Sequence, residues 1–471
     1  MECFHQNKRV AKLILVSFLL LVIGCSDSTG QNIHHHSKLA DTIDSLMQIS
    51  YERGIFNGNV LVTRNDSLVY QKSFGYTDGS GQTQLTKKSI FSPGSIAKEF
   101  VAVSIMMLVE KGAISLDDNL SKFDLRLPDW SKKVTIKHLL NYVGGFPQID
   151  YDNVKNDNDI LEDLQQLPSL LFEPGTDYHY NNNSIFLQKR IIEKVTKKSY
   201  QDFITENIIS PLKMQNVVFD PDFDYPNRTR SFNVHKENAE EFYPSTGWLW
   251  VTIDDLNKWI TALRHNTLIT TTSFKTIAVN QYFQEKGSIL GSYDAQKALH
   301  LHGGQSYQFE AAFMSELEND LSILLMSNNK NQSFNIIQSV YNIIKGKSFS
   351  LPRKSIYRQI RKACHENIDK GIKLYYTLKQ SDYELYNFND PNALNSLGYD
   401  LLSAKKINES ITIFKLAVSE FPKDANLYDS LGEAYYTNKQ YDLALLNYKK
   451  SLEMNPKNTN AEKMIEKINK K

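Results

Sequence analysis

The alternation of apolar and polar residues predicts strands near the start of the chain and again some 230 residues later. Residues 58–63 and 68–74 alternate with a period of two on either side of the turn-forming Arg64-Asn65-Asp66, which predicts a β-hairpin. An amphipathic helix precedes this hairpin from about residue 41. The strand pattern returns later at residues 298–302, 307–314 and 321–326, and an apolar-faced helix follows at 334–344.

The segment between these strands has helical periodicity instead. Apolar residues recur at helical spacing over 96–109 and 185–195, and Pro-Gly turns such as Pro174-Gly175 interrupt the pattern. We therefore expect an α/β (α+β) domain over residues 41–350. Its antiparallel sheet would be built from both ends of the segment, flanked by helices, with a helical subdomain beside it and a cleft between the two.

After Pro352 the strand pattern gives way to helices that contain a repeat. Leu397-Gly398, Phe414 and Pro422 recur as Leu431-Gly432, Tyr448 and Pro456, a spacing of 34 residues that resembles tetratricopeptide repeats. We assign residues 390–471 to such repeats with a capping helix, and 351–389 to a helical connector or degenerate repeat. The resemblance implies a surface that could bind a protein partner.

The N-terminus has the pattern of an export signal. Lys8, Arg9 and Lys12 precede a short apolar run, 13–23, that ends in Gly24-Cys25. This ending resembles a bacterial lipobox, which predicts a signal peptide over 1–24, lipidation of Cys25 and a flexible tether over 25–40. The protein would then be lipid-anchored to a membrane of the bacterial cell envelope. An ordinary signal peptide cut near Gly24 is the alternative.

Composition narrows the function. The chain has 471 residues, 41% of them hydrophobic, and a formal net charge of +1 without a basic stripe, which argues against nucleic acid and favours a small-molecule or peptide substrate. Loss of Cys3 and lipidation of Cys25 would leave Cys364 without a partner, so we expect no internal disulfide. Cys364 lies on an apolar helical stripe and is interpreted as a core residue.

The first chemical motif is Ser95-Ile96-Ala97-Lys98. The spacing Ser-x-x-Lys also occurs at Ser210, Ser327 and Ser403, but only Ser95 follows a Pro-Gly turn and opens a long apolar helix. Lys98 would lie one turn further on the same face. Desolvation and the helix dipole would lower the pKa of this lysine, which would let it accept the serine proton.

Two further clusters could complete a site for acyl transfer. Tyr180 and Asn182 lie on a predicted loop, where the phenol could relay protons and the amide could hold a substrate. His302-Gly303-Gly304 is predicted to end a strand, and its glycines suggest that something approaches the backbone closely. The N–H of Gln305 could then act with that of Ser95 as an oxyanion donor.

Together these clusters resemble the serine β-lactamase and penicillin-binding family, in its branch of class C β-lactamases, D-alanyl-D-alanine carboxypeptidases, D-aminopeptidases and esterases. The resemblance implies Ser95 as nucleophile, Lys98 and Tyr180 as the proton-handling pair, and Asn182 as a substrate contact. It implies that residues 302–305, including His302, Gly304 and Gln305, line the pocket. No cofactor is required.

The chain departs from the family at His302, where β-lactamases usually have lysine, and this favours an esterase or D-amino-acid peptidase. After Leu139-Leu140 the chain reads Asn-Tyr-Val-Gly-Gly over 141–145, where the family commonly has His-Thr-Ser-Gly. This departure and the repeats leave open a second hypothesis, a catalytically silent receptor or scaffold that acts through its repeats. A metal-dependent hydrolase would rest only on the tract His34-His35-His36 and on His300 with His302, so we expect no metal site.

Overall fold

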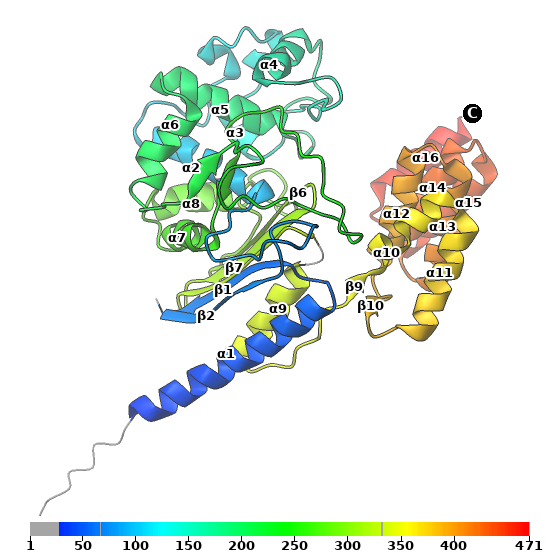
Figure 1. The fold of residues 1–471 in the computed structure, drawn as a ribbon. Coiled ribbons are helices and arrows are strands. Elements are labelled where there is room, and N and C mark those ends of the chain that lie inside the picture. The colour runs from blue at the N-terminus through cyan, green and yellow to red at the C-terminus, as the bar shows by residue number, and fades with distance from the viewer. Residues whose placement is uncertain (1–27, 66, 331–332, 471) are drawn as a thin grey trace, which may run out of the picture.

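The computed structural model describes residues 28–65, 67–330 and 333–470, and it places a mixed α/β domain beside a C-terminal array of helices (Figure 1). The signal-peptide and lipidation predictions, including Cys25, lie outside these residues. Within them, no helix combines the length and apolar character needed to cross a membrane.

A six-stranded antiparallel sheet forms the centre of the α/β domain, in the order β2-β1-β8-β7-β6-β5. The predicted hairpin is confirmed as β1 and β2, and β1 pairs directly with β8, so the two ends of the domain share one sheet. The alternating residues of β1 explain this position because one set faces each side of the sheet. The strands are β1 (Gly58–Arg64), β2 (Ser67–Phe74), β5 (Ser292–Asp294), β6 (Leu299–Ser306), β7 (Phe309–Glu316) and β8 (Leu321–Ser327).

Helices cover both faces of this sheet (Figure 1). On one face, α1 (Ser28–Glu52) and α9 (Ser333–Ile344) pack against Val60, Val62 and their neighbours. Helix α1 begins at Ser28, so the structure has a helix where the sequence pattern predicts a flexible tether. The helices of the other face and of the subdomain are α2 (Ala97–Glu110), α3 (Ile136–Leu140), α4 (Asp157–Gln166), α5 (Asn183–Thr196), α6 (Tyr200–Ile204), α7 (Ile253–Arg264) and α8 (Thr271–Ala278), with a small sheet of β3 (Val217–Phe219) and β4 (Leu249–Val251).

Strand β6 corrects one expectation. The pair Gly303-Gly304 does not end the strand but lies inside it, because β6 continues to Ser306 in register with β7. The predicted close approach does occur: a Cβ on Gly304 would lie 1.9 Å from the Pro93 carbonyl oxygen and 2.5 Å from the backbone nitrogen of Ser95. A side chain at Gly304 would push β6 away from the turn that carries the serine.

The C-terminal array consists of consecutive antiparallel helix pairs. The 34-residue pattern falls on two equivalent pairs, in which Gly398 packs on the ring of Phe414 and Gly432 on that of Tyr448. Cys364 is buried in this array, and burial raises the pKa of its thiol to about 11. A two-stranded sheet of β9 (Lys354–Ser355) and β10 (Tyr386–Asn387) lies at its start, and the helices are α10 (Ile356–Glu366), α11 (Ile368–Ser381), α12 (Pro391–Ser403), α13 (Ile407–Glu420), α14 (Ala425–Thr437), α15 (Tyr441–Met454) and α16 (Thr459–Asn469).

Candidate active site

Ser95 lies in a single 3-10 turn, Gly94–Ile96, that leads directly into α2. Gly94 has φ +55, and a Cβ on it would lie 2.4 Å from the backbone nitrogen of Gln305. Glycine is therefore required here both for the backbone conformation and for the contact with β6. The turn presents the Ser95 hydroxyl at the N-terminal end of α2, as the sequence predicts.

Ser95, Lys98 and Tyr180 form a closed triangle of hydrogen bonds. The Lys98 ammonium lies 3.0 Å from Ser95 Oγ and 2.5 Å from the Tyr180 hydroxyl, and the two hydroxyl oxygens are 2.9 Å apart. Lys98 is only 5% exposed, whereas Tyr180 is 40% exposed, so the triangle has a shielded amine and an open phenol. Such a network can move a proton from the serine to the lysine–tyrosine pair and back, with coupled protonation of the pair.

The loop that carries Tyr180 is fixed on both sides. The ring of Tyr180 packs 4.7 Å from that of buried Tyr142, a residue held in the left-handed conformation at φ 57. Gln148 bridges the loop: its amide donates to the Tyr180 carbonyl, and its oxygen accepts the N–H of Asn182 at 2.7 Å. Tyr142, one of the residues 141–145, therefore supports the loop that carries Tyr180.

Asn182 lies at the edge of the same pocket. Its amide nitrogen donates to the hydroxyl of Tyr151 at 2.5 Å, and its Oδ1 is buried without a hydrogen-bond partner. An unpaired buried acceptor is costly. Asn182 therefore lies beside the pocket, where the resemblance implies a substrate contact.

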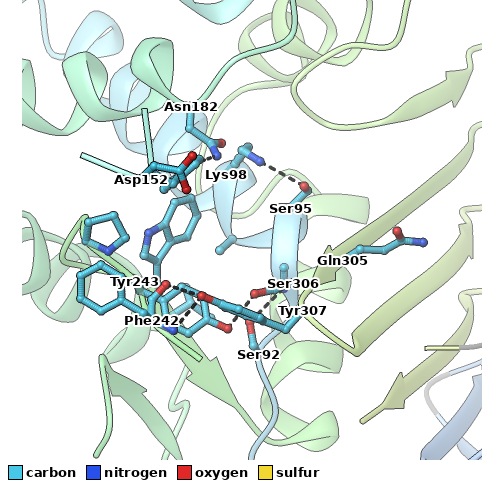
Figure 2. Close-up of a pocket in the computed structure, with 16 residues that line it drawn as sticks. Ser92, Ser95, Lys98, Asp152, Asn182, Phe242, Tyr243, Gln305, Ser306 and Tyr307 are labelled. Carbon is cyan, nitrogen blue, oxygen red and sulfur yellow. Dashed lines mark hydrogen bonds between the residues drawn. The ribbon is translucent and has the colours of Figure 1, made fainter. Parts of the chain in front are cut away.

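A pocket of about 500 Å³ opens in front of Ser95 (Figure 2). Sequence reasoning missed most of its wall, which is aromatic and comes from loops whose apolar residues follow no period. The unusual density of aromatic residues over 242–250 is the signal that could have found part of it. The pocket is lined by Ser92, Gly94, Ser95, Ala97, Lys98, Tyr151, Asp152, Asn182, Phe242, Tyr243, Pro244, Trp248, Leu249, Gln305, Ser306 and Tyr307.

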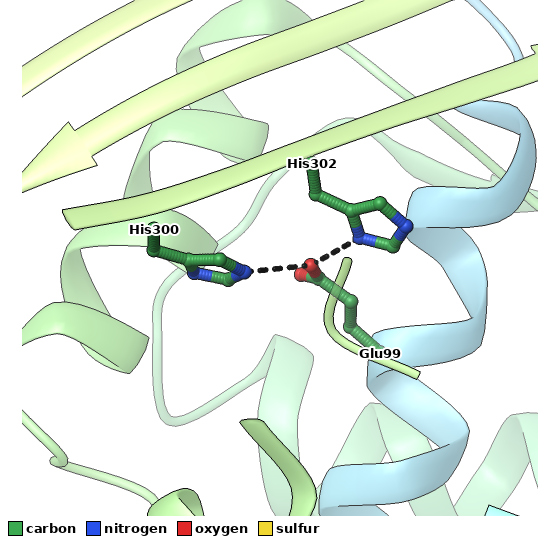
Figure 3. A group of neighbouring side chains, drawn as sticks. All are labelled: Glu99, His300 and His302. Atoms are coloured by element: carbon green, nitrogen blue, oxygen red, sulfur yellow. Dashed lines mark hydrogen bonds and ion pairs between the residues drawn. The ribbon is translucent and has the colours of Figure 1, made fainter. Parts of the chain in front are cut away.

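His302 does not belong to this lining. Its Nδ1 lies 2.6 Å from Glu99 Oε1, and the ring is directed at the buried carboxylate from β6 (Figure 3). The backbone of Gly304 contacts the Ser95 turn, and Gln305 lines the pocket. Of residues 302–305, only the later part therefore reaches the site. The imidazole of His302 is therefore directed away from the pocket, because it bonds to Glu99, a partner that the sequence does not reveal.

Glu99 is fully buried at the centre of this second cluster. Its Oε1 lies 2.6 Å from His302 and 3.5 Å from His300 Nε2, and its Oε2 accepts from Trp259 Nε1 at 2.7 Å. Burial would raise the pKa of Glu99, but the hydrogen bonds and charges of the two histidines outweigh it and lower the pKa to about 2. The carboxylate joins α2 to both β6 and α7.

Glu99, His300 and His302 have the composition of a metal site, with ligand atoms within 4.8 Å of one another. Each of these atoms already has a partner, since His300 Nε2 donates to the Leu290 carbonyl at 2.6 Å and the others bond within the cluster. The ring of Phe313 packs edge-on against His300 at 4.8 Å. A metal ion would have to break these bonds in a closed, aromatic environment, so the residues fit an ion-pair cluster better than a metal centre.

The fold and the sequence both match known proteins. A sequence model of the β-lactamase family matches residues 39–337. Penicillin-binding protein 4* of Bacillus subtilis is 34% identical over 182 residues, and the match covers 36% of this chain and 40% of that protein. This chain therefore spans less than half of the length of that relative.

Among solved structures, an octameric penicillin-binding protein homologue from Pyrococcus abyssi has a TM-score of 0.56 at 22% identity, over 66% of this chain and 78% of that one. A class C β-lactamase has a TM-score of 0.57 at 18% identity, over 67% of this chain and 98% of that one. These likenesses show the fold of the α/β domain. Because the family match extends over more than half of the chain, from α1 to α9, the protein belongs to the β-lactamase family of serine hydrolases.

Proposed function

We propose that this protein hydrolyses an ester, a D-amino-acid peptide or a related amide through an acyl-Ser95 intermediate. The observation that carries the proposal is the hydrogen-bonded triangle of Ser95, Lys98 and Tyr180 at the base of an open pocket. A nucleophile, a shielded amine and an exposed phenol in mutual contact are the parts that acyl transfer needs.

The geometry suggests the following steps. Ser95 Oγ bonds to the substrate carbonyl carbon while its proton passes to the Lys98–Tyr180 pair, and the carbonyl electron pair moves to the oxygen. The N–H groups of Ser95 and Gln305, which lie at the contact between the turn and β6, are placed to stabilise that oxyanion. The bond between the carbonyl carbon and the leaving group then breaks as the carbonyl re-forms, and the pair gives its proton to the departing group. A water molecule next bonds to the acyl carbon and passes a proton to the pair, and the bond to Ser95 Oγ breaks as the pair returns that proton to the serine.

We further propose that the domain works at a membrane of the cell envelope, attached through lipid on Cys25. The support is the sequence pattern of residues 8–25. The helix pairs α12–α13 and α14–α15, with their 34-residue spacing, support an assignment to tetratricopeptide repeats that bind a protein partner. A catalytically silent receptor that acts through these repeats is the competing proposal.

Covalent labelling separates the two proposals. The purified protein without residues 1–27 is treated with a fluorophosphonate and, separately, with a fluorescent penicillin, and mass spectrometry locates the adduct. We expect a fluorophosphonate adduct on Ser95 that is lost in Ser95→Ala. A penicillin adduct at the same residue would bring cell-wall peptides forward as substrates. A folded wild-type protein that neither probe labels would favour the silent receptor.

A further inference from the structure

The charges around the pocket are few and unequally available. Among the described residues that line it, Lys98 supplies the positive charge and Asp152 the negative one. The Lys98 ammonium is occupied by Ser95 and Tyr180. The Asp152 side chain is exposed at the rim, and it lies on the same wall as Asn182, facing Phe242 and Tyr243 across the pocket (Figure 2).

The imidazole of His302, which could have bound an anionic substrate, does not face the pocket either. His302 stands on the strand beside the pocket, but its Nδ1 bonds to Glu99 and the ring is almost buried (Figure 3). Any positive charge on this ring is balanced by an ionised carboxylate at 2.6 Å. A substrate carboxylate would therefore find no free cation on β6.

We infer that the pocket selects substrates that carry a positively charged group near the scissile bond, and that Asp152 is a residue that sets this preference. The inference rests on the proposed acyl-serine chemistry and names the substrate class for it. Esters or amides with an ammonium group fit, whereas the carboxylate-bearing substrates of a β-lactamase do not.

Two physical effects act in the same direction. The carboxylate of Asp152 attracts a cation and repels an anion at the rim, with a strength limited by solvent screening. The aromatic rings of the wall, Tyr151, Phe242, Tyr243, Trp248 and Tyr307, offer negatively polarised faces that also favour a cation. A carboxylate would lose hydration in this pocket without gaining an ion pair.

Three p-nitrophenyl esters of equal length, ending in trimethylammonium, tert-butyl or carboxylate, test the preference. The first two ends have nearly the same shape and differ in charge, so their comparison isolates electrostatics. We expect kcat/KM for the cationic ester to exceed that of the neutral one about fivefold and that of the anionic one more than about tenfold at low ionic strength. The ratios should shrink as salt is added.

Asp152→Asn should reduce the preference of the cationic over the neutral ester about threefold. Glu162→Gln removes the same charge from the exposed face of α4, outside the pocket lining, and should leave all ratios unchanged. Equal kcat/KM for the three wild-type reactions, a faster anionic ester, or an unaltered preference in Asp152→Asn would overturn the inference.

Calorimetry of the same three esters binding to the Ser95→Ala variant measures their affinities, and so the charge preference, without turnover. If wild-type protein fails to hydrolyse any ester and no probe labels Ser95, the proposed function is wrong. The calorimetric order of affinities then still decides the inference: cationic above neutral above anionic supports it, and any other order contradicts it.

Discussion

Lys98 and Glu99 are neighbours on α2, yet they belong to two regions with opposite properties. Lys98 faces the pocket, where it contacts two hydroxyl groups, one of them on a tyrosine that is 40% exposed. Glu99 faces the core, where two histidines and an indole surround its carboxylate. Both regions contain a buried charge and short hydrogen bonds, and both tie α2 to another element.

The difference between them is access to water and substrate. In the pocket, the hydroxyl and amine groups can each donate or accept a proton, and they lie beside a cavity of about 500 Å³. In the Glu99 cluster, His302 and Trp259 bond to one carboxylate and His300 lies beside it in a closed environment. These bonds hold elements together but leave no group free to exchange a proton with a ligand. We expect changes in the first region to affect mainly turnover and changes in the second to affect mainly folding.

Replacing Lys98 by methionine is the largest expected effect on activity. The variant lacks the amine that shares the Ser95 proton, so kcat should fall about 10²- to 10⁴-fold. Its free energy of unfolding should stay within about 1 kcal/mol of wild type, because an apolar chain of similar length fills the same space. Turnover of a p-nitrophenyl ester and urea denaturation measure the two quantities. A variant that keeps full turnover would remove Lys98 from the mechanism.

Glu99→Ala should instead lower the free energy of unfolding. Removal of the carboxylate leaves His302 Nδ1 and the Trp259 N–H without their partner, which should cost about 3–5 kcal/mol in the free energy of unfolding. Ser104→Ala is the matched control, since Ser104 is also buried on α2 but bonds only to the Phe100 carbonyl. If Glu99→Ala were no less stable than Ser104→Ala, the cluster would not hold these elements together.

Acid should weaken the same cluster selectively. The pKa of Glu99 is lowered from 4.5 to about 2, so the native state keeps this group ionised where the unfolded chain protonates it. The stabilisation is present above pH 4.5 and disappears as the pH falls towards 2, with a total of about 3 kcal/mol. Glu99→Gln, which cannot titrate, should show a shallower loss of stability across this window in acid denaturation. Equal slopes for the two proteins would contradict the assignment.

The sequence predicted the triangle of Ser95, Lys98 and Tyr180 better than the cluster around Glu99. Ser95, Lys98 and Tyr180 were identifiable because their chemistry depends on local setting: a helix start and a loop. Glu99 was missed, since a glutamate that follows a lysine in a helix is usually a solvated residue. Its burial depends on β6 and α7, more than 150 residues away. The alternation of His300 and His302 was the available signal, because residues two apart on a strand share a face.

Lys189 tests the comparison with a third case, a buried amine that lacks both a catalytic partner and a bonded carboxylate. Its ammonium donates to the Thr246 carbonyl at 2.8 Å and lies 4.2 Å from the ring of Trp248, while Lys98 lies 5.8 Å from that ring. Burial lowers the pKa of Lys189 from 10.5 to about 7, against the opposing charges of Asp220 and Asp157.

Because the folded pKa is depressed, the cost of burying the charge is complete below pH 7 and is relieved as the pH rises towards 10.5. Lys189→Met should therefore be more stable than wild type by about 2 kcal/mol at pH 6, and this gain should shrink between pH 7 and 10. Urea denaturation across this range measures it. A gain that does not change with pH would mean that packing, not charge, is responsible. A loss at pH 6 would show that the bond to Thr246 and the contact with Trp248 outweigh desolvation, which would make Lys189 a support of the pocket wall.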